Sequence, residues 1–353
     1  SICFVIERSI LSLKAQQLLN QGRIQFGHFE DSVWNANGRD DLTPDAFGVP
    51  RNALDKALKY KQFQYFGGMS QRFIFGCAMV DLGYRNTVFA YLFDTTTGEL
   101  FSRSVKRPYH LGMSLSTSPV EGESRFSAGD LSVVQGYEAN PRVKTLTLKV
   151  GTELSIQARM PEAGFQPMSL STRAGYHGWV YANKTAGLPL TGELHWRGQR
   201  FDLTELGAMG HHDFSCGYMR RETWWNWACL SGFAQDDKHQ AHAIGLNIST
   251  GVNETTFSEN CVWISGRCIP LAAATFDFDA SDVLQTWRVT TLDGRINLTF
   301  SSLGMHKEKL LLPLVKSHFR QIFGHFNGQV ELDGVCYTVN NLTGFVEDQF
   351  VRW

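Results

Sequence analysis

The residues best suited to chemistry are concentrated in one segment, Gly207–Gly232. It holds the acid–base triplet 211–213 (His-His-Asp), together with Asn226 and three of the nine tryptophans, at positions 224, 225 and 227. Indole rings supply a large apolar area and one N–H donor each. A neighbouring imidazole and carboxylate can move a proton near neutral pH. The segment therefore predicts a ligand pocket with a proton-transfer group at its edge.

Strand alternation decides which of these side chains can share a pocket. If 208–214 is a strand, His211 and Asp213 face one side, and His212 faces the other. In 223–229 the same alternation separates two sets, Trp225 with Trp227 and Trp224 with Asn226. A barrel interior lined by Trp225 and Trp227 would form a natural pocket wall. The alternative is that these rings fill the core between two domains, because large aromatics dominate protein cores.

Asp213 is the main catalytic candidate, with His212 as the second. An apolar wall that raises the pKa of Asp213 would let it act as a general acid. Alternatively, Asp213 is a structural carboxylate bound to backbone N–H groups or to Arg220 or Arg221. We expect no metal site, because His318 and His325 match no standard zinc spacing, and we expect surface or edge positions for the histidines.

Other polar residues interrupt apolar strand-like runs. A buried amide or carboxylate must be hydrogen-bonded, so each either orients a ligand or satisfies a neighbouring strand. Lys184 can pair with a ligand carboxylate or lie solvated in a turn, and Glu347 can pair with Arg352. The candidate ligand-binding residues are Trp224, Trp225, Trp227, Asn226, Tyr181, Asn247 and Glu259.

The elements that must position these residues read as β-strands. Roughly twenty short strands follow one another at spacings typical of sandwiches or barrels. Helices are expected only near the N-terminus, one from Ser9 to Gly22 and a shorter one opening at Asn52 with an Asp55–Lys59 pair. Tight turns are predicted at 94–98, 151–152, 197–198, 265–266, 293–294 and 333–334.

Composition bounds the class of protein. The 353 residues exceed one usual core, and 43% apolar with 19% charged residues fit a globular chain. The net charge is −1, and positive and negative residues are interspersed, so the sequence shows no basic patch that would bind nucleic acid. Seven scattered cysteines without a C-x-x-C pair favour reduced thiols in the cytosol, so a Cys261–Cys268 bridge is disfavoured.

Several familiar signals are absent from the sequence. The apolar run at 2–6 is too short for a signal peptide or a membrane span, so we expect a soluble, cytoplasmic protein that makes at most transient membrane contact. No phosphate-binding loop, dinucleotide fingerprint, nucleophile elbow or zincin motif occurs. We therefore expect no cofactor. The sequence leaves the oligomeric state open.

An ordered series of short motifs resembles an uncharacterised bacterial family, domain of unknown function 2804. The series covers nearly the whole chain and includes residues 51–52, 61–66, 181–184, 188–189, 192, 213, 217, 223–227, 245–247, 259–260, 287, 321–324, 328, 344–347 and 352–353. Asp213 and the tryptophans belong to this pattern, whereas His211 and His212 do not.

The resemblance extends to a wider group with AttH-like proteins and carotenoid 1,2-hydratases, to which tocopherol cyclase and some fungal Diels–Alder cyclases are structurally akin. It implies an all-β fold of two lipocalin-like antiparallel β-barrel or sandwich domains packed side by side, with short N-terminal helices. The expected division is an extension at 1–60, a first domain at 61–165 and a second at 176–353. The resemblance also implies an apolar, often isoprenoid-like ligand.

Three hypotheses about function remain open. The leading one is an enzyme that hydrates, isomerises or cyclises an apolar molecule by proton transfer, with aromatic faces stabilising a carbocation. The second is a non-catalytic lipid or isoprenoid carrier of lipocalin type. The third is a carbohydrate-active sandwich, which would need two carboxylates across a cleft.

Overall fold

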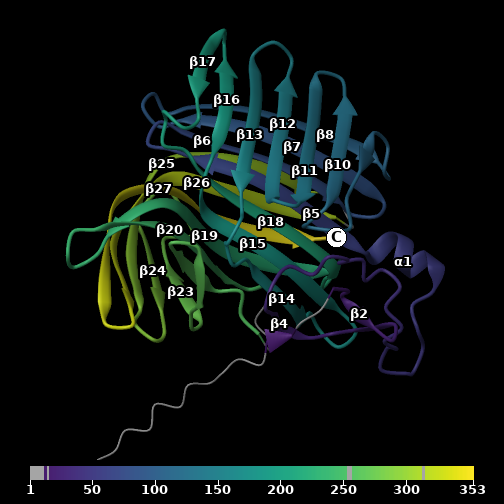
Figure 1. Cartoon of the computed structure of the whole chain (residues 1–353). Helices are drawn as coiled ribbons and strands as arrows, with labels where there is room; N and C mark the ends of the chain where they lie inside the picture. Colours follow the sequence, from purple (N-terminus) through teal and green to yellow (C-terminus); the bar gives the residue numbers. More distant parts are fainter. Residues whose placement is uncertain (1–11, 14–15, 253–256, 312–314) are drawn as a thin grey trace, which may run out of the picture.

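Hydrogen-bond pairing gathers the strands into three large sheets (Figure 1). The structure is a computed structural model that describes residues 12–13, 16–252, 257–311 and 315–353. The nine strands of what we term the central sheet are, in spatial order, β1 (Ser12–Leu13), β4 (Gly27–Phe29), β14 (Met168–Arg173), β15 (Trp179–Pro189), β18 (Met209–Tyr218), β5 (Lys61–Met69), β6 (Phe73–Asp81), β7 (Arg85–Asp94) and β8 (Glu99–Pro108).

Two further sheets complete the architecture. The seven strands of the outer sheet are β17 (Gln199–Asp202), β16 (Thr191–Trp196), β13 (Leu154–Pro161), β12 (Arg142–Val150), β11 (Leu131–Ala139), β10 (Gly122–Ala128) and β9 (Met113–Ser114). The nine strands of the C-terminal sheet are β22 (Arg267–Pro270), β21 (Cys261–Ile264), β20 (Ala241–Thr250), β19 (Glu222–Gln235), β27 (Val335–Arg352), β26 (Lys316–Leu332), β25 (Ile296–Leu311), β24 (Trp287–Thr291) and β23 (Ala274–Asp277).

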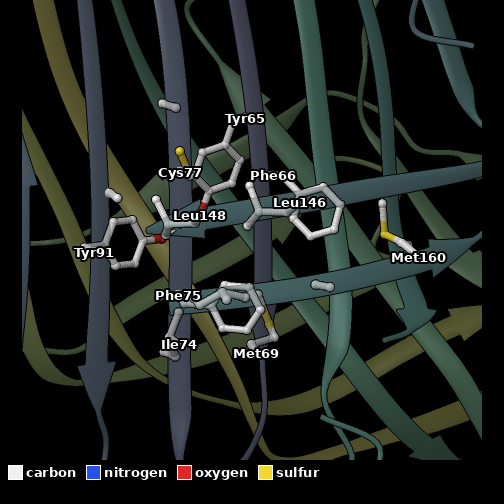
Figure 2. Packing of buried hydrophobic residues seen from close by; sticks show 14 of the residues in the cluster. Tyr65, Phe66, Met69, Ile74, Phe75, Cys77, Tyr91, Leu146, Leu148 and Met160 are labelled. Atoms are coloured by element: carbon white, nitrogen blue, oxygen red, sulfur yellow. Dashed lines mark hydrogen bonds between the residues drawn. The ribbon is translucent and has the colours of Figure 1, made fainter. Parts of the chain in front are cut away.

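The central sheet is covered on both faces. Phe66 of β5 packs in the core shared with Leu146 and Leu148 of the outer sheet (Figure 2). Its neighbour Tyr65 points the other way and contacts Trp227 and Phe345 of the C-terminal sheet. Strands β5, β6 and β15 are therefore buried almost continuously, whereas β11 to β13 alternate between buried and exposed residues.

The C-terminal sheet curls around a core of its own. Trp287, Phe300 and Val346 are fully buried there, together with residues from the other long strands of the sheet. This core lies on the opposite face of β19 and β27 from the one that meets the central sheet. The all-β prediction is confirmed, and the sheets form two β-units side by side, one from the central and outer sheets and one from the C-terminal sheet.

Sheet membership divides the chain at a different point from the expected connector. Strands β14, β15 and β18 follow residue 165, yet β15 and β18 pair with one another and β18 pairs with β5. The third sheet begins only at β19. We therefore propose a division between β18 and β19, in place of the expected one at 165–176.

The helix expected from Ser9 to Gly22 is wrong where the structure describes it, since residues 1–11 and 14–15 lie outside the described part. Leu19–Asn20 form β2, which pairs with β3 (Arg23–Ile24). Leu18 donates its backbone N–H to Asn35 O and is fully buried in a cluster with Phe29 and Trp179. Tertiary packing therefore overrides the apolar pattern that suggested a helix.

The other local predictions are confirmed. Asn52 caps α1 (Ala53–Lys59), accepting a hydrogen bond from Asp55 N, and Lys59 pairs with Asp55 at 2.6 Å. Each of the six predicted turns joins adjacent antiparallel strands. Three of them have two successive positive φ angles, at 197–198, 265–266 and 333–334, as tight hairpin turns require. The six described cysteines are all unbridged, Cys261 and Cys268 included.

Candidate functional site

A cavity with a volume of about 270 Å³ lies between the central sheet and the C-terminal sheet. The prediction placed the tryptophan wall inside a barrel. The wall instead faces the space between two packed sheets, because the barrel side of β19 is occupied by Ala228 and Leu230. The apolar lining comes mainly from aromatic and branched side chains of both sheets, among them Phe63, Val80, Phe89, Trp225, Trp227, Phe319, Val351 and Trp353.

Alternation along β19 sorts the four candidate residues of the Trp-Trp-Asn-Trp run. Trp225 and Trp227 line the cavity. Trp224 lies on the opposite face and is 48% exposed, so it is separated from the cavity. Asn226 also lies on that opposite face, where its Nδ2 donates to Asp348 Oδ1 at 3.1 Å.

The side chains along strand β27 show where the cavity ends in the interior of the protein, a place that we term the inner end. Glu347, Gln349 and Val351 line the cavity at alternate positions, whereas Phe345, the next residue inward on this face, belongs to the core. Glu347 is only 5% exposed. Its carboxyl group therefore marks the point where the cavity meets the packed interior.

A buried lysine joins two carboxylates at this inner end. Lys184 Nζ lies 2.7 Å from Glu259 Oε1 and 3.2 Å from Asp213 Oδ2. It also lies 4.5 Å from the centre of the Trp227 ring, a cation–π contact. Burial alone would lower the pKa of Lys184, but the charges of Asp213 and Glu259 outweigh burial and raise that pKa. Lys184 is therefore a permanent cation.

Asp213 and Glu259 respond differently to this shared partner. Burial raises the pKa of the Asp213 carboxyl above its ordinary value, although Lys184 and a hydrogen bond from Ser215 Oγ, at 2.6 Å, act against it. Burial also acts to raise the pKa of Glu259, but Lys184 outweighs it and leaves that pKa below its ordinary value. Glu259 is therefore the ionised partner of the lysine.

Among the carboxyl groups at the inner end, Glu347 is the one matched to neutral pH. Trp225 Nε1 donates to its Oε2 at 3.1 Å, and Gln321 Nε2 donates to its Oε1 at 2.9 Å. Burial raises the pKa of Glu347 to about 7, against the effects of the Trp225 hydrogen bond and the Lys184 charge. These contacts replace the Arg352 pairing expected from the sequence.

Sequence reasoning missed Glu347 as a site residue. The available signal was its alternation with Gln349, Val351 and Trp353, which places a carboxyl on the same strand face as an indole. Whether that face meets β19 and Trp225 depends on the β19–β27 pairing, in which Trp227 lies opposite Glu347. The order of strands in a sheet cannot be read from the alternation alone.

The two histidines face opposite sides of the central sheet, as alternation predicts. His211 Nε2 lies 3.2 Å from Tyr65 OH, which in turn lies 2.6 Å from Tyr91 OH. His212 points toward the outer sheet, where its Nε2 lies 3.2 Å from Tyr137 OH. Both are 2% exposed, so the expected surface or edge positions are wrong. Neither ring lines the cavity.

Burial sets the charge of these histidines. It lowers the pKa of His211 to about 3 and that of His212 well below its ordinary value. Both rings are therefore neutral at physiological pH. In the described part of the chain, no group of three or more His, Cys, Asp or Glu side chains could hold a metal ion.

Of the two remaining candidates, Asn247 supports the site and Tyr181 does not. Asn247 Oδ1 accepts the Trp227 indole N–H at 2.7 Å, and its Nδ2 donates to Glu259 O at 2.9 Å. Asn247 thus fixes both the indole and the segment before β21 that carries Glu259. Tyr181 lies in a separate cluster, where its hydroxyl accepts from Val33 N at 3.0 Å, so it is not brought to the cavity.

The fold and the site define an all-β protein with an aromatic-walled cavity between two packed sheets and ionisable groups at its inner end. A family model described as Domain of unknown function (DUF2804) matches residues 10–353. The chain therefore belongs to this family, as the sequence motifs indicated. Within the described residues, no helix is both long and apolar enough to cross a membrane.

Comparison with curated proteins gives no match. Among solved structures, CghA with Sch210972 is similar over 96% of this chain and 97% of its own, with 11% identity and a TM-score of 0.52. A putative AttH (NE1406) from Nitrosomonas europaea matches over 87% and 98%, with 11% identity and a TM-score of 0.49. Kievitone hydratase from Nectria haematococca matches over 92% and 98%, with 10% identity and a TM-score of 0.43. At this identity, the likeness to CghA shows a shared fold.

Proposed function

We propose that the cavity binds an apolar, isoprenoid- or lipid-like small molecule and protonates it, catalysing a cofactor-free hydration, isomerisation or cyclisation. The observation that carries the proposal is a buried carboxyl, Glu347, with a pKa of about 7, at the inner end of an aromatic-walled cavity. A general acid works best when its pKa lies near the operating pH. A cavity of about 270 Å³ lies near the lower end of the range for small-molecule sites.

The proposed reaction begins with proton transfer from Glu347 to a ligand alkene. The π electron pair of the double bond forms the new C–H bond, which leaves a carbocation on the neighbouring carbon and a carboxylate on Glu347. Trp225 and Trp227 line the cavity, and aromatic rings of this kind can stabilise a cation. The cation is then quenched by water, by loss of a neighbouring proton, or by attack of a second double bond of the same ligand followed by proton loss.

Asp213 is assigned the complementary role in this proposal. The sequence suggested Asp213 as the acid, but its carboxylate faces Lys184 at 3.2 Å, which favours the ionised form. Glu347 has no cation within ion-pair distance among the described residues. We therefore assign proton donation to Glu347 and acceptance of the departing proton to Asp213. A proton then passes through water from Asp213 to Glu347, and this transfer returns both carboxyls to their starting state. His212 has no role in this scheme because it faces the outer sheet.

The test uses geraniol and farnesol as probes, incubated with the full-length protein in deuterium oxide. Catalysis predicts products that carry carbon-bound deuterium, detected by mass spectrometry. Glu347→Gln should abolish deuterium incorporation, and Asp213→Asn should slow it by about a hundredfold or more, the usual contribution of a general base. Glu222→Gln removes an exposed carboxyl from β19 and serves as the matched control. Full incorporation by Glu347→Gln would contradict the assignment of the acid.

A second candidate function is a non-catalytic carrier of the same class of ligand. It is favoured by the completeness of the polar contacts at the inner end, where Lys184, Asp213, Glu259 and Glu347 all have protein partners. Such a network is also what a purely structural role requires. Saturable quenching of tryptophan fluorescence by farnesol, without any deuterated product, would favour the carrier over the enzyme.

A further inference from the structure

The polar groups of the cavity are distributed unevenly between its two ends. At the inner end, Lys184 is already paired with Glu259 and Asp213, and Glu347 adds a third carboxyl. An anionic ligand group placed there would meet more negative than positive charge. The inner end therefore suits the uncharged part of a ligand.

The mouth of the cavity carries the opposite charge. Arg85 opens β7 and, by alternation, lies on the same face as Thr87 and Phe89, which also line the cavity. Among the described residues, no carboxylate pairs with Arg85. Lys106 lies directly across the strand pair from Thr87, and its Nζ is 3.2 Å from Glu308 Oε2. Lys309, which follows Glu308 on β25, also lines the cavity, and no carboxylate among the described residues pairs with it. Arg85 and Lys309 therefore leave the mouth with unmatched positive charge.

The strand register gives the separation of the two ends. Asp213, Tyr65, Ala78 and Phe89 form one row across four adjacent strands. Three strand spacings correspond to about 14 Å, and the four residues from Phe89 to Arg85 add about 13 Å along the strand. The backbone positions of Asp213 and Arg85, one at each end of the cavity, therefore lie about 19 Å apart. The lining between them includes Phe63, Val80 and Phe89 and is predominantly apolar.

We propose that the ligand of this cavity is an anionic amphiphile, a long-chain or isoprenoid carboxylate, that enters chain first and leaves its carboxylate on Arg85. This inference rests on the proposed function, since it defines the substrate class of the same cavity. The unmatched positive charge at the mouth fits an anionic head group, and Arg85 lies on the same strand face as Thr87 and Phe89 of the lining. The orientation brings an internal double bond, remote from the carboxylate, to Glu347 and Asp213.

The test compares farnesoate with farnesol, which share one hydrocarbon chain and differ in the head group. Binding to the full-length protein is measured by tryptophan fluorescence at low and high salt. We expect farnesoate to bind about two- to fivefold more tightly than farnesol at low salt, the usual range for a solvent-accessible ion pair, and the preference to shrink at high salt. Arg85→Gln should abolish the preference by weakening farnesoate binding, whereas farnesol, which has no charge to pair, should still bind and so report that the variant is folded.

Arg107→Gln is the matched control. Arg107 is an exposed arginine that follows Lys106 on β8 and, by alternation, points to the other face, so this variant should retain the preference for farnesoate. Equal affinity for the two probes, or an equal loss of both with Arg85→Gln, would overturn the inference while farnesol binding still supports the proposed function. Absence of binding by both probes would count against the apolar ligand itself, and so against both proposals.

Discussion

Glu259 and Glu347 carry the same side chain and are both buried at the inner end of the cavity, yet their pKa values shift in opposite directions. Glu259 contacts the Lys184 ammonium directly at 2.7 Å, so the attraction between opposite charges exceeds the cost of burial. Glu347 receives only neutral donors, from Trp225 and Gln321. The position of one lysine thus divides the carboxyls into a permanent anion and a group that exchanges protons near neutral pH.

The raised pKa of Glu347 predicts a pH dependence of stability. Folding raises this pKa from 4.5 to about 7, so the folded chain binds more protons than the unfolded chain between those values. The contribution of Glu347 to stability is therefore fully present below about pH 4.5 and is lost as the pH rises through about 7. Glu347→Gln lacks this contribution.

Melting temperatures measured between about pH 5 and about pH 8 test the prediction at the level of this one group. The wild-type protein should lose stability relative to Glu347→Gln as the pH rises, by about 1–3 kcal/mol over the window. The exposed Glu222→Gln variant should keep a constant difference from wild type. A difference between wild type and Glu347→Gln that does not change with pH would show that the carboxyl titrates in its ordinary range.

At the scale of the element, alternation along a strand was the part of the site that the sequence could predict. It correctly separates Trp225 and Trp227 from Trp224 and Asn226, because side chains on a strand alternate whatever the strand pairs with. It could not bring Glu347 to Trp225, since that contact depends on the pairing of β19 with β27, more than a hundred residues later in the chain. It also could not show that Lys184 lies beside Asp213, which requires the β15–β18 register.

The alternation of β19 predicts unequal costs for replacing two tryptophans three residues apart. Trp227→Phe removes the indole N–H that Asn247 Oδ1 accepts and leaves space beside Tyr65 and Phe345. We expect a loss of about 1–3 kcal/mol in the free energy of unfolding, measured by urea denaturation. Trp224→Phe, on the exposed face, is the matched control and should change stability by less than about 0.5 kcal/mol. Equal losses would contradict the assignment of the two faces.

At the scale of the whole molecule, the sequence predicts the class of fold better than its assembly. Turn residues such as Ser265-Gly266 predict hairpins from the local sequence alone, and the structure contains these hairpins. The central sheet lies between two other sheets, so its strands do not alternate between apolar and polar residues. In the sequence, such strands resemble any other buried apolar run. The N-terminal helix prediction failed for the same reason, since the burial of Leu18 depends on partners such as Trp179 that are distant in the sequence.

The two β-units come into close backbone contact at a pair of glycines. Gly245 lies on β20 of the C-terminal sheet, and a Cβ added there would lie 2.1 Å from Ala186 O and 2.7 Å from Gly187 N, both on β15 of the central sheet. These are backbone atoms that cannot rotate away. Gly187 has a positive φ at a bulge of β15, and its N–H donates to Ser231 Oγ of β19 at 3.0 Å. The contact therefore leaves no room for a side chain between β15 and β20, which belong to the two sheets that enclose the cavity.

Gly245→Ala should therefore destabilise the protein by about 3 kcal/mol, the upper end of the range for overpacking, and should weaken farnesol binding because the cavity walls are displaced. Gly232→Ala is the matched control in the same sheet, since its added Cβ would meet Leu342 Cδ2, the movable end of a side chain, at 3.2 Å. Its cost should stay below about 1 kcal/mol, with farnesol affinity unchanged. Urea denaturation and tryptophan fluorescence measure the two effects on the same samples. If both alanine variants were equally stable and bound farnesol equally well, the close approach of β15 and β20 would not determine the geometry of the cavity.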